Sequence, residues 1–176
     1  MKFKMEDLIL AKKGDKEAFS RVIQNVKVKL YKTAMAILKN DDDSCDAIQE
    51  TLISAYKNIN RLEHTEFFET WIIRILINKC YDVIKKNQKI VNINEKISEE
   101  VDSFYEMYST ESELELILNK IEKDLKMVTV LYYYDELPVK EIAIILNIPE
   151  GTVKSRLSRA RKSISEIYKL GGENVG

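Results

Sequence analysis

The spacing of apolar residues along the first half of the chain predicts a bundle of helices. From Met5 to about Lys86 the apolar positions recur every three or four residues, as they do on one face of an α-helix. Gly14 and the sequence NDDDS at 40–44 are the clearest interruptions of this pattern. The pattern therefore predicts an all-α fold for this half of the chain.

Three helix starts can be placed within this region. Asp15 can cap the helix that follows it, and the acidic run from Asp41 to Asp43 favours a helix N-terminus there. Another helix should begin near Phe67. Its predicted buried side is formed by Ile72, Ile73, Leu76, Ile77, Cys80, Val83 and Ile84.

The opposite side of this last helix combines Trp71 with Arg74, Asn78 and Lys85. Two interpretations are open. Trp71 can pack under a neighbouring helix while the charged groups are simply solvated. Alternatively, an aromatic ring, cations and an amide on one helix face can stack on and hold unpaired bases.

Residues 87–111 depart from the helical pattern and are enriched in Asn, Ser and Glu. The stretch 94–115 is acidic almost throughout, although the net charge of the whole chain is only -1. Such a composition predicts a tether that is extended or disordered in the free chain.

The sequence LPVKEIAIILNIPEGTVKSRL at 137–157 is typical of a helix-turn-helix. Pro138 suits the start of the first helix, and Pro149 suits the start of the second. Asn147 tolerates the left-handed conformation that ends a helix. The small Ala143 allows the two helices to approach closely. A simple helical hairpin is the alternative interpretation.

The second helix of this motif has one apolar stripe and one polar side. The polar side carries Ser155, Ser158, Arg159 and Lys162, with Lys154 at its margin. Small hydroxyl side chains among cations let a helix enter the major groove of DNA, where Arg can reach base edges. A solvated charged face is the alternative, and it applies most strongly to the cations beside the apolar stripe.

These patterns predict two small helical domains joined by an acidic linker. We place the N-terminal domain at 1–87, the linker at 88–111, the helix-turn-helix domain at 112–170 and a flexible tail at 171–176.

Several classes of protein are disfavoured by the composition. The first ten residues have no apolar run typical of a signal peptide, so we expect a cytoplasmic protein. Cys45 and Cys80 form no CxxC motif and His64 is the only histidine, so no metal site is expected. With five glycines in the chain, no glycine-rich phosphate loop is present, and we expect no cofactor and no small-molecule substrate.

At this point the sequence resembles the small extracytoplasmic-function (ECF) group of sigma-70 family sigma factors of bacterial RNA polymerase. DAIQETLISAYKNI at 46–59 is similar to the segment that contacts the polymerase clamp. FFETWIIRILINKCYDVIKK at 67–86 is similar to the segment that melts and reads the minus-10 element, and 137–164 to the helix-turn-helix that reads the minus-35 element.

The resemblance implies a role for particular residues. Asp46, Gln49 and Glu50 would contact the clamp of the β′ subunit. The loop at 58–68 would hold a flipped base. Minus-10 DNA would be bound by Trp71, Arg74, Asn78 and Lys85. Minus-35 DNA would be bound by Lys154, Ser155, Ser158, Arg159 and Lys162, with Thr152 and Arg156 on phosphates.

The function expected from this resemblance is a promoter-specificity subunit that acts with core RNA polymerase and is not itself an enzyme. It would bind promoter DNA in duplex and single-stranded form and be restrained by a membrane-linked anti-sigma factor. An autonomous helix-turn-helix repressor is the alternative, and it would bind duplex DNA unaided. A DNA-processing enzyme is a weaker alternative, because no cluster of catalytic groups stands out.

Overall fold

The structure is a computed structural model and describes residues 5–94, 117–118 and 120–172. These residues are helical or lie in short connections, and no β-strand occurs among them, as predicted. The N-terminal part contains α1 (Met5–Lys12), α2 (Lys16–Leu38), α3 (Asp41–Asn58), the short 3-10 helices η1 (Ile59–Arg61) and η2 (Thr65–Phe67), and α4 (Phe68–Asn94). The C-terminal part contains α6 (Lys123–Thr129), the π-helix η4 (Val130–Tyr134), α7 (Val139–Leu146) and α8 (Glu150–Gly172).

The helix starts agree closely with the sequence signals. Gly14 has a φ of 95° and lies in the turn that separates α1 from α2. Asp15 then caps α2, since its Oδ1 accepts a hydrogen bond from the Ala18 N–H at 2.8 Å. The acidic run lies at a helix N-terminus, as predicted, but Asp41 to Asp43 form the first turn of α3 itself and the cap is the preceding residue, Asn40.

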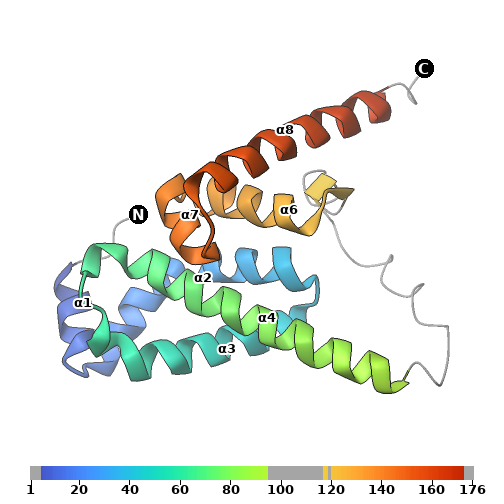
Figure 1. The fold of residues 1–176 in the computed structure, drawn as a ribbon. Coiled ribbons are helices and arrows are strands. Elements are labelled where there is room, and N and C mark those ends of the chain that lie inside the picture. The colour runs from blue at the N-terminus through green and yellow to red at the C-terminus, as the bar shows by residue number, and fades with distance from the viewer. Residues whose placement is uncertain (1–4, 95–116, 119, 173–176) are drawn as a thin grey trace.

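The N-terminal bundle is formed by α2, α3 and α4, with α1 against one end of α2 (Figure 1). The predicted apolar sides form its core. Phe68, Ile72 and Leu76 of α4 are buried, and so are Val22 and Leu30 of α2. Burial of these side chains is the main favourable contribution to this fold.

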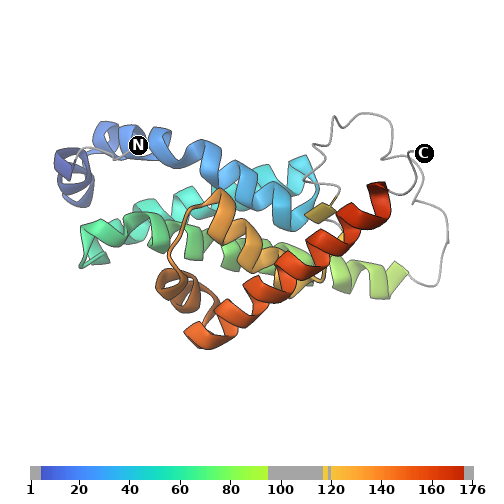
Figure 2. The ribbon, with the colours of Figure 1, turned by 90° about the horizontal axis from the view of Figure 1, so that it is seen from above.

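The C-terminal helices stack on this bundle in a second layer. α7 packs against α4, and the π-helix η4 packs against α2. α8 lies outermost on α6 and α7, and runs obliquely over the bundle (Figures 1 and 2). α3 lies on the far side of the bundle from α8.

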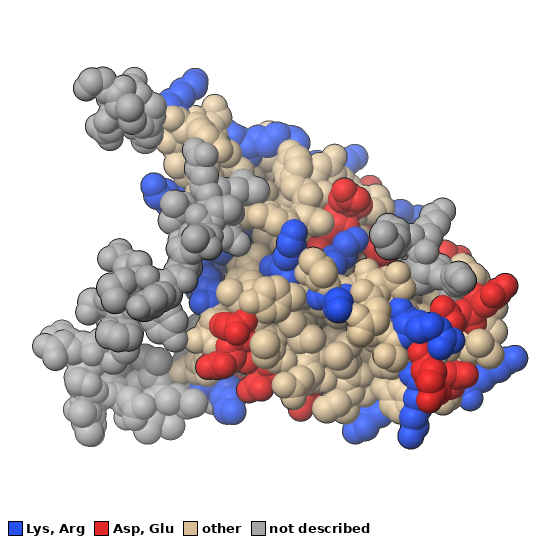
Figure 3. Space-filling model, turned by 180° about the vertical axis from the view of Figure 1, so that it is seen from behind, with Lys and Arg blue, Asp and Glu red and all other residues tan. Residues whose placement is uncertain are grey.

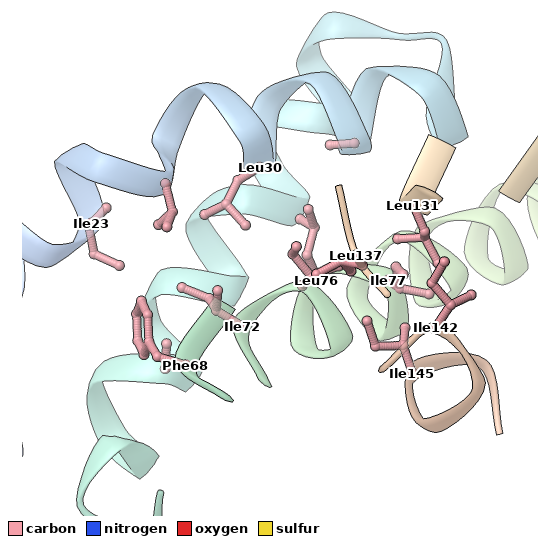
Figure 4. Close-up of a cluster of buried hydrophobic side chains, with 14 of the residues drawn as sticks. Ile23, Leu30, Phe68, Ile72, Leu76, Ile77, Leu131, Leu137, Ile142 and Ile145 are labelled. Carbon is pink, nitrogen blue, oxygen red and sulfur yellow. The ribbon is translucent and has the colours of Figure 1, made fainter. Parts of the chain in front are cut away.

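The two parts share one hydrophobic core. Figure 4 shows Ile77 of α4 beside Leu131 and Leu137, with Ile142 and Ile145 of α7 close by. A smaller cluster holds the C-terminal helices to one another and includes Leu125, Val130 and Ala160. The sequence predicted both domains but not this extensive contact between them.

The helix α4 continues to Asn94. It therefore extends beyond residue 87, the predicted end of the first domain. The segment QKIVNIN at 88–94 contains neither Gly nor Pro, so nothing in it ends the helix. The rest of the predicted linker, 95–111, lies outside the described residues, as does 173–176 of the predicted tail. The domain boundaries stay a prediction.

Candidate nucleic-acid and polymerase interface

The helix-turn-helix is built as its sequence indicates. Pro138 precedes the first turn of α7, and Asn147 ends the helix in the left-handed conformation, with a φ of 53°. The N–H of Ile148 then donates to the carbonyl of Ala143 at 3.1 Å, which closes the turn. The carbonyl of Pro149 accepts from the N–H of Thr152 at 2.9 Å and starts α8.

One side of α8 is buried and the other is offered to solvent. Val153, Leu157 and Ala160 are each at most 3% exposed. Most of the predicted minus-35 residues lie on the opposite side. The exposed residues there are Lys154, Ser155, Ser158, Arg159 and Lys162.

These cations are not equivalent. Among the described residues, neither Lys154 nor Arg159 makes an ion pair, so both are available to a ligand. Lys162 lies 3.9 Å from the carboxylate of Glu166 one turn further along, and both side chains are well exposed. Such an exposed pair is easily broken by a stronger anion.

Arg156 differs from the other predicted minus-35 residues, as does Thr152. Both are half-buried. The guanidinium of Arg156 donates to the carboxylate of Asp124 on α6, so in the free chain it also ties α8 to α6. The predicted phosphate contact of Arg156 would compete with this ion pair.

The predicted minus-10 residues share one stripe of α4. Arg74, Asn78 and Lys85 are exposed. Trp71 is half-buried against the core, and its ring lies 6.0 Å from that of Phe68. Trp71 therefore has a packing role, while part of its ring is still accessible beside the three polar groups.

The loop before α4 lies close to this stripe in the sequence and is held by the N-terminal helix. Lys12 donates from its Nζ to the carbonyl of Leu62 in this loop. His64 and Phe67 are exposed, with ring centroids 6.1 Å apart. Two accessible rings in an anchored loop can stack on an unpaired base, as predicted for 58–68.

The predicted polymerase contacts lie on the outer face of α3. Asp46, Gln49 and Glu50 are exposed, while Ala47 and Thr51 on the inner face are buried. Glu50 lies 3.4 Å from Nζ of Lys79 on α4, yet its side chain remains 62% exposed. α3 itself lies on the opposite side of the bundle from α8 (Figure 1).

Charge is spread over the surface in patches. Figure 3 shows Lys and Arg side chains along the upper part of this view, where the C-terminal helices lie, whereas basic and acidic groups are mixed lower down, over the bundle. An excess of cations over the C-terminal helices suits a partner with negative charge.

A third polar site joins the two parts of the chain, and the sequence did not indicate it. Asp135, which follows η4, is 1% exposed. Both of its carboxylate oxygens accept from Thr33 Oγ1 of α2, at 2.9 and 3.0 Å. A lone Asp in a mixed-charge stretch gives no sequence signal of burial, which is why this residue was missed.

No group of His, Cys, Asp and Glu within the described ranges is arranged to hold a metal ion. The helices described here also include none with the length and apolar character needed to cross a membrane. Cys45 is exposed and Cys80 is buried, and burial raises the pKa of the Cys80 thiol to about 12.

Known proteins resemble the chain in both of its parts. The Sigma-70 region 2 family matches residues 22–90, and the Sigma-70, region 4 family matches residues 111–164. The ECF RNA polymerase sigma factor SigW of Bacillus subtilis is 34% identical over 168 residues, which cover 87% of this chain and 90% of SigW. The ECF RNA polymerase sigma-E factor of Haemophilus influenzae is 28% identical and covers 86% of this chain and 87% of its own.

Solved structures share the fold. The sigma factor RpoE from Bartonella quintana, in complex with the anti-sigma factor NepR, has a TM-score of 0.73 at 24% identity, over 86% of this chain and 97% of its own. CnrH, in complex with the cytosolic domain of CnrY, has a TM-score of 0.70 at 20% identity, over 93% and 96%. With the region 2 and region 4 matches and the similarity to SigW, the chain belongs to the ECF group of sigma-70 family sigma factors.

Proposed function

We propose that the two domains divide the work of a promoter-specificity subunit of RNA polymerase. The outer face of α3 docks on core polymerase, the stripe on α4 captures the unpaired minus-10 strand, and α8 reads the minus-35 duplex. The observation that carries this proposal is the exposed face of α8, where Lys154 and Arg159 lie beside Ser155 and Ser158 and form no ion pair with any other described residue. A face with small side chains and free cations fits a major groove.

The contact with polymerase is proposed for Asp46, Gln49 and Glu50. Exposed carboxylates and an amide on one helix face offer acceptors to a basic surface, such as a coiled coil in the clamp of the β′ subunit. Because these three residues are exposed although the C-terminal helices are packed on the bundle, this face is accessible in the packed form of the chain.

Melting by this protein would be capture of an opened strand and would need no catalytic group. Unstacking and unpairing a base costs a few kcal/mol. Stacking on protein returns about 1 to 3 kcal/mol per base. The two terms are similar in size, so contacts with polymerase must also contribute. On this account the chain is not an enzyme.

Restraint by an anti-sigma factor is the proposed regulation. RpoE of Bartonella quintana was solved with an anti-sigma factor, and CnrH with the cytosolic domain of CnrY. We extend this kind of partner to the present chain and propose that it acts in the cytoplasm, held by a membrane-linked partner. The acidic linker at 88–111 would lie along the basic nucleic-acid channel of polymerase.

Copurification with core polymerase, followed by run-off transcription, tests the proposal. We expect the full chain to bind core polymerase and to direct transcripts that depend on both promoter elements. Specific binding to duplex DNA in the absence of polymerase, with no transcript in its presence, would instead identify an autonomous repressor.

A further inference from the structure

A buried polar cluster lies where the C-terminal helices meet the bundle. Asp135 is bound by Thr33, as described above, and its backbone carbonyl accepts from Nζ of Lys29 at 3.0 Å. The same Nζ lies 3.0 Å from Oε2 of Glu69 on α4. Asp135 of the C-terminal domain is thus held directly by two residues of α2, and Lys29 links this contact to α4 through Glu69.

A second polar contact lies along the same interface. Thr70 of α4 donates from its hydroxyl to the carboxylate of Glu141 on α7. The apolar side chains of Ile77, Leu131 and Ile142 belong to the core that the two domains share (Figure 4). The polar groups therefore fix the relative position of the two domains within a largely apolar interface.

The π-helix accounts for the position of Asp135. A π turn contains an extra residue, which shifts the side chains that follow it around the axis. Tyr132 and Tyr133 are exposed, whereas the next turn ends with Asp135 at the interface, where its N–H donates to the carbonyl of Val130 at 3.2 Å. π turns often mark functional positions, because the regular α-helix is the more stable alternative.

The packed arrangement does not fit both promoter elements at once. According to their numbering, the minus-10 and minus-35 elements are about 25 base pairs apart. This separation is about 85 Å at about 3.4 Å per base pair. In the packed form α7 touches α4, and the 23 residues of α8 extend only about 35 Å at about 1.5 Å per residue. The two domains must separate before both DNA faces can bind.

We propose that Asp135 is a latch that holds the two domains together as a neutral carboxylic acid and releases them when it ionises. The latch requires three features together. These are the buried side chain of Asp135, the Thr33 hydroxyl and the packing of the π-helix on the bundle. The inference rests on the proposed function, because it regulates access to the two DNA faces.

The direction of the pH dependence follows from burial. Burial raises the pKa of the Asp135 carboxyl from its ordinary 3.8 to about 7, and the hydrogen bond from Thr33 and the charge of Lys29 only partly oppose this rise. The charged groups that act on it are Lys29 from α2 and Glu69 from α4, while Nζ of Lys32 lies 6.0 Å from the ring centroid of the neighbouring Tyr134. Once the domains separate, water reaches the carboxyl and its pKa returns toward the ordinary value.

Closure is therefore strongest below pH 4 and is lost progressively as the pH rises through about 7. Between pH 8 and pH 6, the ratio of closed to open chain should rise about tenfold. Above pH 8 it should change little, because Asp135 is then ionised in both forms.

Energy transfer between two dyes on the full chain, without polymerase, tests the latch. One dye is placed on the exposed Cys45 of α3, and the other on α8 after Ser165→Cys. Cys80 stays unlabelled in the folded chain, because its thiol is buried and its pKa is about 12. We expect transfer to fall from pH 6 to pH 8 with a midpoint near 7.

Three variants distinguish the proposed role of Asp135 ionisation from a general effect on the stability of the fold. Asp135→Asn mimics the neutral acid and should stay closed at both pH values. Thr33→Val removes the hydroxyl, which favours the ionised carboxylate, and should lower the closed-to-open ratio more at pH 8 than at pH 6. Glu136→Gln removes the adjacent, exposed charge and should behave as the wild type. Circular dichroism confirms that each variant is folded.

A pH profile that is flat in the wild type, or unchanged in Asp135→Asn, would overturn the latch. Association with core polymerase is measured separately. Asp135→Asn should bind polymerase more weakly than the wild type at pH 8, because less of it is open. If even the wild type fails to bind polymerase, the proposed function is wrong, while the dye measurement still decides the latch.

Discussion

The two helices assigned to DNA, α4 and α8, leave very different surfaces free. α4 is covered by α2 and α3 on one side and by α7 on another, so only a narrow stripe with Arg74 and Asn78 remains. α8 rests on α6 and α7 along one side, and the side with Ser155 and Arg159 is open. A narrow stripe next to accessible rings suits a single strand, whereas a broad face of small side chains and cations suits a duplex groove.

The largest expected effect is the loss of binding to core polymerase, the complex in which the two helices act together. Asp46→Arg or Glu50→Arg should reduce association with core polymerase below detection, because like charges across an interface cost several kcal/mol. Both residues are exposed, so the fold should persist. A pull-down measures the loss, with Glu17→Arg, an equally large charge change at an exposed position of α2, as the control.

Wild-type retention of polymerase by both α3 variants would remove the clamp assignment. The proposal that α4 and α8 act on DNA together, within one polymerase complex, would then lose its basis.

A smaller effect is expected from Arg159 on the exposed face of α8. Arg159→Ala in the polymerase complex should cost about 1 to 3 kcal/mol on the preferred upstream element and relax discrimination at one base pair. Competition binding against single-base variants of the element measures both quantities. A uniform loss of affinity, with selectivity intact at every position, would make this face an electrostatic anchor.

The smallest effect is expected from Arg156, because its guanidinium already forms an ion pair with Asp124 of α6. Arg156→Ala should weaken binding to all sequences nearly equally and reduce the magnitude of the salt slope by about one. Binding titrations at several salt concentrations measure this. Selective loss at one base pair would assign Arg156 to base reading instead.

Local features of the fold could be predicted from the sequence because they depend on neighbouring residues. The Asp15 cap, the left-handed Asn147 and the buried row from Ile72 to Cys80 follow from capping preferences and helical period, and all are confirmed. The exposed faces of α3 and α8 follow from the same period. Their roles in binding stay predictions.

The contact between the domains could not be predicted in the same way. Asp135 and Thr33 are 102 residues apart, and neither stands out by type or by spacing. The small Ala143 predicts a close approach of α7 and α8, and the two helices do pack together, but Ile142 and Ile145 of α7 also join the core of the bundle. Helical period shows which side of a helix is buried and does not show how many partners bury it.

The most direct test of the account compares Arg74→Ala with Arg159→Ala, each of which removes one exposed guanidinium, in the assembled polymerase complex. Each variant is titrated with two probes, a single-stranded minus-10 oligonucleotide and a duplex that carries the minus-35 element. We predict that Arg74→Ala loses about 1 kcal/mol on the single strand alone, and that Arg159→Ala loses affinity on the duplex alone. Equal losses of both variants on both probes would contradict the assignment of the two faces to different forms of DNA.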